Sequence, residues 1–173
     1  ISLRDGTPAL AAGPPEPERA TGGAGGPAAK LPADWVSLDI GGAAAGSTSP
    51  VGEDGFDVSG SGKDVWYTSD SFRFVYQQVS GDFDIRARLV SLLETHEWAK
   101  AGVMVRQSKA PGATHASLLV SAQNGCVFQR RREAGGETLS SGAGGPRSGG
   151  TWLRLLRLGK TVTAHIASDE AGA

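Results

Sequence analysis

The chain is poor in the features that would assign it a chemistry. Its 173 residues contain one cysteine, Cys126, so no disulfide can form within the chain. The net charge is −1, so no overall field draws it to nucleic acid or to an anionic membrane. No apolar run comes near the ~20 residues that span a bilayer, and no signal peptide opens the sequence. We therefore expect no nucleic-acid partner and no membrane insertion.

Residue patterns for catalysis are missing as well. Glycoside hydrolysis needs two carboxyl groups, about 5–9.5 Å apart, but Asp82 and Asp84 share their strand face with Arg86. The segment 96–100 begins like the helix of a zinc protease, yet Lys100 stands where the second histidine is required. The three histidines form no Cys/His cluster in the sequence. We expect that the protein is not an enzyme.

The chain does have period-two alternation of apolar and polar residues, which is typical of half-buried strands. The strongest stretch is 71–106, which contains Phe72, Phe74, Tyr76, Phe83, Ile85, Ala87, Leu89, Ala101, Val103 and Val105. No segment has a convincing 3.6-residue apolar period, and only 90–98 is a candidate for a helical turn. Many short strands joined by turns, in a chain with 26 glycines, predict an all-β, antiparallel sandwich.

Composition divides the chain in two. Residues 1–33 hold twenty Ala, Gly or Pro residues, which predicts a disordered linker. The sandwich domain is expected over 34–173, with strands at 35–40, 56–58, 65–67, 115–122, 152–158 and 162–166 besides the stretch above. Asn124-Gly125 predicts a hairpin that pairs 115–123 with 126–133. Residues 41–55 and 134–150 are expected to be loops, the second one mobile.

Three separated motifs follow one another along the chain: D-V-W-Y-T-S-D-S-F-R-F-V-Y-Q-Q-V-S-G-D-F-D-I-R-A-R-L, W-A-K-A-G-V-M-V-R and T-W-L-R-L-L-R-L-G-K-T-V-T-A-H-I-A-S-D. In this order they resemble the DUF1349-type domain. That family has the concanavalin A-like lectin/glucanase fold, a jelly roll of two antiparallel sheets. The resemblance covers 35–169 and implies that further strands follow, so we expect a piece of a longer protein with an incomplete C-terminal end. It also implies an accessory module of bacterial extracellular or cell-surface proteins.

Carbohydrate is the ligand that this resemblance suggests, because sugars stack on aromatic rings while polar side chains bind their hydroxyl groups. Trp98 stands in a polar loop and is the ring most expected to be exposed, whereas Trp35 and Trp152 fit the core and Trp66 fits either place. The ligand-binding candidates are Trp98, Trp66, Lys100, Arg106, His115, Gln129 and Arg130.

Charge is unevenly placed along the domain. Residues 34–98 hold eleven acidic and four basic side chains, and residues 99–173 hold four acidic and ten basic ones. The favoured interpretation is a set of ion pairs between the two halves. A Ca²⁺ site is the sharper alternative, with Glu53, Asp54, Asp64 and Asp70 as loop carboxylates. Arg130-Arg131-Arg132 fits a solvated strand end better than an anion-binding patch, because Arg131 points away from the other two.

These observations favour a non-catalytic binding module that takes carbohydrate, or a cell-surface glycan, on a concave sheet and its rim. The alternative is a structural or protein-interaction domain without a glycan site, which would contact other domains of the same chain. A remnant of a glycoside hydrolase is the least favoured interpretation.

Overall fold

The computed structural model describes residues 2–4, 30–142, 144–145 and 150–168, and every regular element in these ranges is a strand. The prediction of an all-β, antiparallel fold is thus confirmed. No described segment forms a helix that is long and apolar enough to cross a membrane.

The strands are β1 (Ser2–Arg4), β2 (Val36–Ile40), β3 (Ser47–Val51), β4 (Gly55–Ser59), β5 (Asp64–Trp66), β6 (Ser69–Tyr76), β7 (Phe83–Ser91), β8 (Lys100–Arg106), β9 (His115–Ser121), β10 (Gly125–Arg131), β11 (Leu139–Ser141), β12 (Thr151–Leu158) and β13 (Thr161–Ser168).

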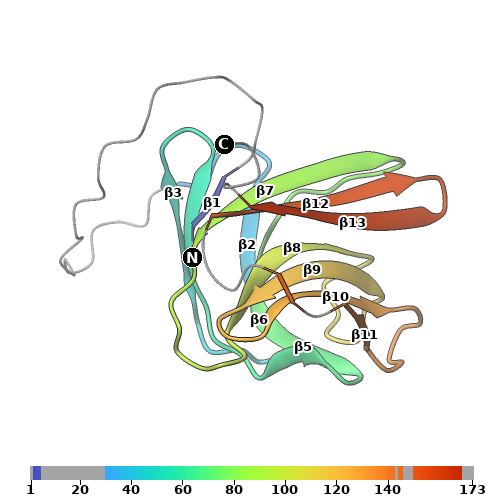
Figure 1. Ribbon diagram of the computed structural model, residues 1–173. Coiled ribbons are helices and arrows are strands. Elements are labelled where there is room, and N and C mark those ends of the chain that lie inside the picture. The colour runs from blue at the N-terminus through green and yellow to red at the C-terminus, as the bar shows by residue number, and fades with distance from the viewer. Residues whose placement is uncertain (1, 5–29, 143, 146–149, 169–173) are drawn as a thin grey trace.

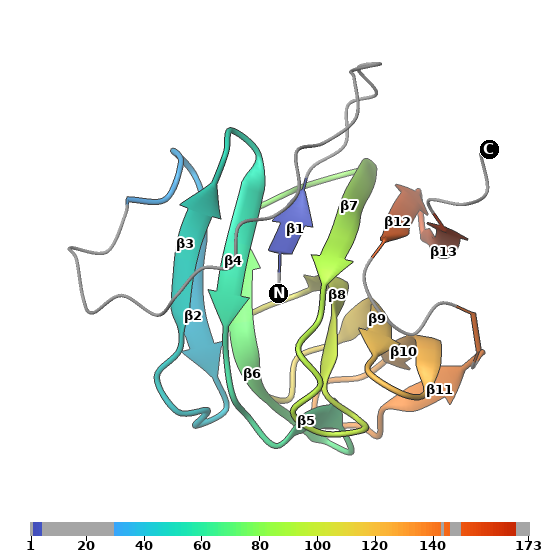
Figure 2. The same cartoon turned by 60° about the vertical axis from the view of Figure 1, so that its left-hand side comes forward.

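The strands form two layers (Figures 1 and 2). One layer is a six-stranded sheet with the order β13-β12-β7-β1-β4-β3. The other layer consists of a four-stranded sheet, β11-β10-β9-β8, and a three-stranded sheet, β2-β6-β5. In this second layer, β6 and β8 are neighbours in space, although no described backbone ladder joins them.

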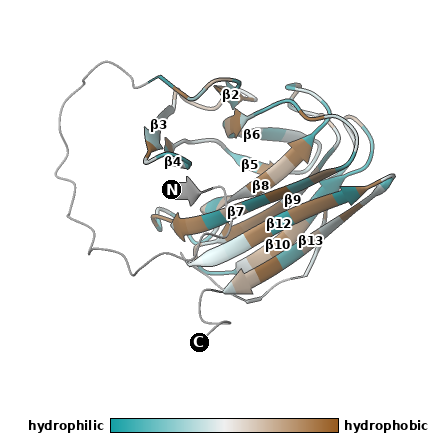
Figure 3. Ribbon diagram, turned by 90° about the horizontal axis from the view of Figure 1, so that it is seen from above, coloured by the Kyte–Doolittle hydropathy of each residue, from teal (hydrophilic) through white to brown (hydrophobic). Residues whose placement is uncertain are grey.

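Half of the space between the layers is an apolar core. Leu89, Leu153 and Leu155 of the six-stranded sheet pack against Val103 and Val120 of the four-stranded sheet, and all five are buried. Hydrophobic stretches on β7, β8 and β12 are interrupted by polar residues, as alternating strands require (Figure 3). This core fixes the inner and outer faces of β8, β9 and β10.

The other half of the interlayer space, between β2–β6 and β3, contains a set of polar contacts that joins the layers. Arg73 of β6 donates to Asp39 of β2 at 2.8 Å and to the hydroxyl of Thr48 of β3 at 3.4 Å. Ser37 and Thr48 share a hydrogen bond of 2.6 Å between the layers. Because Arg73 points toward β3, the alternate residues of β6 point away from the six-stranded sheet.

The predicted hairpin at Asn124-Gly125 is confirmed. Strands β9 and β10 pair antiparallel across Asn124-Gly125, with Arg131 opposite His115 at the far end. Gly125 has a φ of 74°, and a β-carbon there would lie 2.7 Å from the carbonyl oxygen of Gly144. Only glycine satisfies both conditions, so the hairpin depends on this residue.

Four expectations need correction or lie partly outside the described residues. Strand β3 lies in the range expected to be a loop, and β11 lies in the loop expected to be mobile, because pairing with β4 and β10 outweighs weak local signals. The helical turn at 90–98 is wrong, since β7 runs to Ser91 and a loop follows. Ser2–Arg4, inside the expected linker, form β1 between β4 and β7, while 5–29 lie outside the described residues.

The uneven charge distribution is explained by ion pairs that join the two halves of the domain. Asp64 pairs with Lys100 at 2.6 Å, Asp84 with Arg154 at 2.7 Å, and Asp70 with cations of β8 and β10. The pairs at Asp84 are solvated, so they contribute little to stability. The pairs at Asp70 are buried, and they form the centre of the candidate site.

Core packing gives a direct test within a single strand. Leu155 of β12 is fully buried, whereas Leu158 of the same strand is 61% exposed. Leu155→Ala is expected to lower the free energy of unfolding by about 2–5 kcal/mol, because a cavity remains among well-packed neighbours. Leu158→Ala should change it by less than ~0.5 kcal/mol. Urea denaturation of both variants checks the assignment, and equal effects would contradict the described orientation of β12.

Candidate functional site

The candidate site is the outer face of the second layer, where β6 and β8 lie next to each other. Phe72, Phe74 and Tyr76 alternate with Arg73, so they point away from the six-stranded sheet. Their rings form a row, with centroids 5.6 Å apart for the first pair and 5.1 Å for the second, which is stacked. Arg106 covers the Phe72 ring at 5.3 Å, and Lys109 covers the Tyr76 ring at 5.8 Å. We call these three rings the aromatic row.

The aromatic row borders a large cleft between β6 and β8, which we call the β6–β8 cleft. Its volume is about 2780 Å³, and it reaches from the row past β8 to Trp98 and Lys100. Trp98 lies in the loop before β8 and is 49% exposed. The ammonium group of Lys100 lies 5.8 Å from the centre of the Trp98 ring and also pairs with Asp64. One exposed ring and one partly covered row of rings therefore border the same open space.

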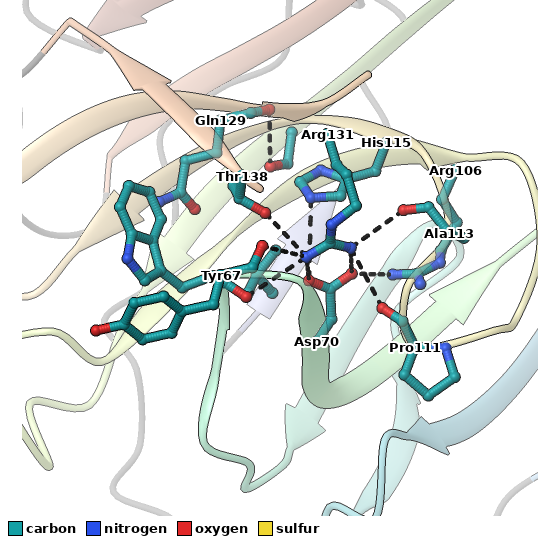
Figure 4. A network of polar contacts seen from close by, with 12 residues as sticks. Tyr67, Asp70, Arg106, Pro111, Ala113, His115, Gln129, Arg131 and Thr138 are labelled. Carbon is teal, nitrogen blue, oxygen red and sulfur yellow. Dashed lines mark hydrogen bonds and ion pairs between the residues drawn. The ribbon is translucent and has the colours of Figure 1, made fainter. Parts of the chain in front are cut away.

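A buried ion pair supports this surface from one end (Figure 4). Arg131 of β10 binds Asp70 of β6 with two parallel hydrogen bonds of 2.7 and 2.9 Å, and both side chains are fully buried. Arg106 of β8 adds a third bond to the same carboxylate at 3.1 Å. Bidentate guanidinium–carboxylate pairs fix both distance and orientation. The pair therefore sets the position of β6 relative to β8 and β10.

The remaining donors of Arg131 are used by backbone carbonyls from three separate turns. Tyr67 accepts at 3.0 Å, Ala113 at 3.1 Å and Gly136 at 2.9 Å, and the hydroxyl of Thr138 accepts at 2.9 Å. Tyr67 has a φ of 48°, which is rare for a residue with a side chain. This strained turn directs its carbonyl at the guanidinium group, since a buried cation requires a partner for each donor.

His115 is the unusual member of the buried cluster. Its imidazole is buried, its Nε2 lies 4.0 Å from Asp70, and neither ring nitrogen has a hydrogen-bond partner among the described residues. Burial lowers the pKa of His115 from 6.5 to about 4; the Asp70 carboxylate opposes this shift, and the charges of Arg131 and Arg106 add to it. Burial also lowers the pKa of Arg106. Near neutral pH the imidazole is uncharged, so the cluster holds two guanidinium groups and one carboxylate.

The structure brings some of the sequence-predicted ligand residues together and separates others. Arg106, His115 and Gln129 share the outer face of the four-stranded sheet, and all three are held in or beside the buried cluster. Trp66 is half-buried in β5, and its carbonyl accepts from Arg131 at 3.4 Å. Arg130 points to the opposite face and donates to Ser141 at 3.0 Å. Of the predicted ligand residues, Trp98, Lys100, Arg106, His115 and Arg130 line the cleft, and Trp98 is the exposed one among them.

The predicted calcium carboxylates are placed differently. Glu53 and Asp54 are exposed in the turn between β3 and β4, Asp64 pairs with Lys100, and Asp70 is enclosed by guanidinium groups. No three His, Cys, Asp or Glu side chains of the described ranges gather in a metal-binding arrangement. Ca²⁺ binding therefore stays a prediction from the sequence alone.

Sequence reasoning missed the central residue of the site. The run Arg130-Arg131-Arg132 was expected to be a solvated strand end, and this is wrong for Arg131, which is 1% exposed. The inference that Arg131 points away from its neighbours is correct, and it was the available signal. A buried cation needs a buried anionic partner, and that partner is Asp70, which the sequence had placed among the calcium carboxylates.

The chain matches no protein-family model, no curated protein and no solved structure in comparisons with each. The function must therefore be argued from the geometry of the site.

The buried ion pair predicts a large loss of stability when one partner is removed. Arg131→Met leaves the Asp70 carboxylate buried without its bidentate partner, so the free energy of unfolding should fall by about 3–5 kcal/mol. Arg132→Met, next to it but exposed, should change it by less than ~0.5 kcal/mol. Thermal and urea unfolding of both variants measures the difference. A small effect of Arg131→Met would show that the pair does not hold the site.

His115 predicts a specific dependence of stability on pH. Its folded-state pKa is about 4 against 6.5 for the unfolded chain, so the unfolded chain binds a proton first as the pH falls. Stability should therefore drop between pH 6.5 and 4 by up to about 3 kcal/mol from this residue. His115→Gln should flatten that part of the curve, whereas His165→Gln at an exposed position should leave it unchanged. Urea denaturation at several pH values measures the free energy of unfolding of each protein. The prediction is contradicted if this free energy depends on pH in the same way in His115→Gln as in the unmodified protein.

Proposed function

We propose that this chain is a non-catalytic binding module that takes carbohydrate along the β6–β8 cleft. The observation that carries the proposal is the exposed Trp98 ring at the same cleft as the aromatic row of β6. Sugar rings present apolar C–H faces, which stack on aromatic side chains, and hydroxyl groups, which need donors and acceptors nearby. A long open cleft suits an extended glycan better than a small compact ligand.

The polar groups along the cleft are suited to binding rather than to catalysis. Gln77, Gln78 and Lys109 are exposed beside the aromatic row and offer amide and ammonium groups to sugar hydroxyls. The carboxylates at the cleft are Asp54, Asp64 and Asp84, and Asp64 and Asp84 are already paired with cations. Guanidinium groups hold the pKa of Asp84 well below its usual range, so it is a poor proton donor.

The resemblance to DUF1349-type domains supports the same proposal, because their concanavalin A-like jelly roll belongs to a superfamily of lectins and glucanases. The two-layered, antiparallel arrangement of the chain is compatible with that fold. An extracellular or cell-surface location would fit a glycan ligand and follows from the same resemblance. A protein-interaction domain without a glycan site is the alternative, and the unpaired edges of β6 and β8 favour it.

Glycan binding is tested by one exposed ring. Trp98→Ala should weaken binding to any glycan that the unmodified protein retains on a broad array by at least about tenfold, or ~1.4 kcal/mol. The reason is that the sugar loses its stacking partner, while the exposed ring contributes little to folding. Leu158→Ala, exposed but outside the cleft, serves as the matched control. Isothermal titration measures both, and an array without any binding, or an unchanged affinity of Trp98→Ala, would refute the proposal.

A further inference from the structure

Two strand edges border the β6–β8 cleft, and neither has a partner strand among the described residues. Strand β6 pairs with β2 over Phe72–Tyr76 on one edge, while β5 occupies only Ser69–Ser71 of the other edge. Strand β8 pairs with β9 along Lys100–Arg106 and is the last strand of its sheet. The backbone groups on the open edges of β6 and β8 therefore remain available to a further strand.

The two open edges belong to the same layer and are held near each other. Arg106 of β8 reaches across to Asp70 of β6 and covers the Phe72 ring. No described strand lies between them, although every other internal strand of this layer has a hydrogen-bonded neighbour on each side. The cleft thus lies where no described ladder joins the three-stranded sheet to the four-stranded sheet.

The size and the lining of the cleft are suited to polypeptide. Its volume of about 2780 Å³ exceeds the roughly 300–1,000 Å³ of pockets for small molecules. On the inner side it is lined by Phe83, Ile85 and Val105, which pack against the core and are only half-buried. A strand placed between β6 and β8 would cover these side chains with every second residue of its own.

The charge of the cleft indicates the composition of the strand. Eleven Lys and Arg residues line the cleft. Five of them are paired with Asp39, Asp64, Asp70 or Asp84, which leaves Lys63, Lys109, Arg130, Arg132, Arg157 and Lys160 without a carboxylate partner among the described ion pairs. Lys109 stands at the outer rim beside Tyr76, and no ion pair holds it among the described residues. Acidic side chains on the outward face of an added strand would meet this excess of positive charge.

We propose that the β6–β8 cleft binds an extended segment of a second polypeptide, which adds as a β-strand to the open edges of β6 and β8. Aliphatic side chains of the segment alternate with acidic ones. The aliphatic side chains cover Phe83, Ile85 and Val105, and the acidic side chains face Lys109 and the other cations at the rim of the cleft. Main-chain hydrogen bonds provide affinity, and the alternate side chains provide specificity. The strand edges lie in the same cleft as the Trp98 ring, but the added strand would contact the backbone of β6 and β8 and does not require that ring.

The test begins with selection of binders from a library of random ten-residue peptides. Enriched sequences should alternate aliphatic and acidic residues and should lack proline, because proline cannot donate to a strand ladder. Amide hydrogen exchange of the protein with the best peptide should then slow by at least about tenfold at Phe72–Tyr76 and Lys100–Arg106. Exchange at β13, which is also an edge strand, should stay the same.

Two variants and one altered peptide complete the test. Lys109→Glu should weaken binding of the acidic peptide at least fivefold, whereas Lys30→Glu, exposed and outside the cleft, should not. A copy of the peptide with two central prolines should not protect either strand. Trp98→Ala should retain peptide binding, which separates this proposal from glycan binding. Selection without any enriched peptide, enrichment without alternation, or protection by the proline peptide would overturn the proposal. So would protection of both edges without peptide, either by self-association or by further strands in a longer form of the chain.

Discussion

The geometry of the second layer depends on one buried guanidinium–carboxylate pair. Arg131 and Asp70 are 61 positions apart in the chain, and both are enclosed by protein. A buried guanidinium must find an acceptor for each donor, so the turns that hold Tyr67, Ala113 and Gly136 are drawn toward a single point. These contacts join β5–β6, the loop after β8, and the end of β10. Without them, the three-stranded and four-stranded sheets would be linked mainly by the chain itself, and the aromatic row would have no fixed position beside β8.

The two halves of the interlayer space are held together by different forces. Leu89, Leu153 and Leu155 exclude water from one half, whereas Arg73, Asp39 and Thr48 link the layers by hydrogen bonds in the other. The half that contains Arg73 reverses the usual orientation of β6, because the aromatic residues of this strand are left on the outer face. Aromatic side chains that would serve as core in a simpler sandwich therefore become the wall of a cleft. The same reversal explains why the cleft is both apolar in its rings and cationic at its rim.

Much of the architecture could be predicted from local pattern. Alternation located β6, β7, β8, β12 and β13, the Asn124-Gly125 turn fixed the β9–β10 hairpin, and the opposite charges of the two halves anticipated the ion pairs. Alternation shows that two faces differ but does not show which one meets the other layer, so the outward orientation of Phe74 could not be known. The burial of Arg131 also had no local signal, because it depends on Asp70 and on carbonyls from distant turns.

Strands β3 and β11 carry little apolar alternation, and they form because β4 and β10 provide backbone hydrogen-bond partners. The exposure of Trp98 was predictable from its polar loop, whereas the place of Arg106 and His115 in a buried cluster was not.

Strand β1 gives the six-stranded sheet an unusual mechanical character. Ser2–Arg4 lie between β4 and β7, so three residues join β3–β4 to the β7–β12–β13 portion that carries the apolar core. A register shift between Ser2 and Leu3 shortens the regular ladder further. Tension applied to this segment would load a few backbone hydrogen bonds long before it reached the packed leucines. The sheet is therefore weakest at β1. Strands β3 and β4 could separate there from β7, β12 and β13 while the apolar core stayed packed.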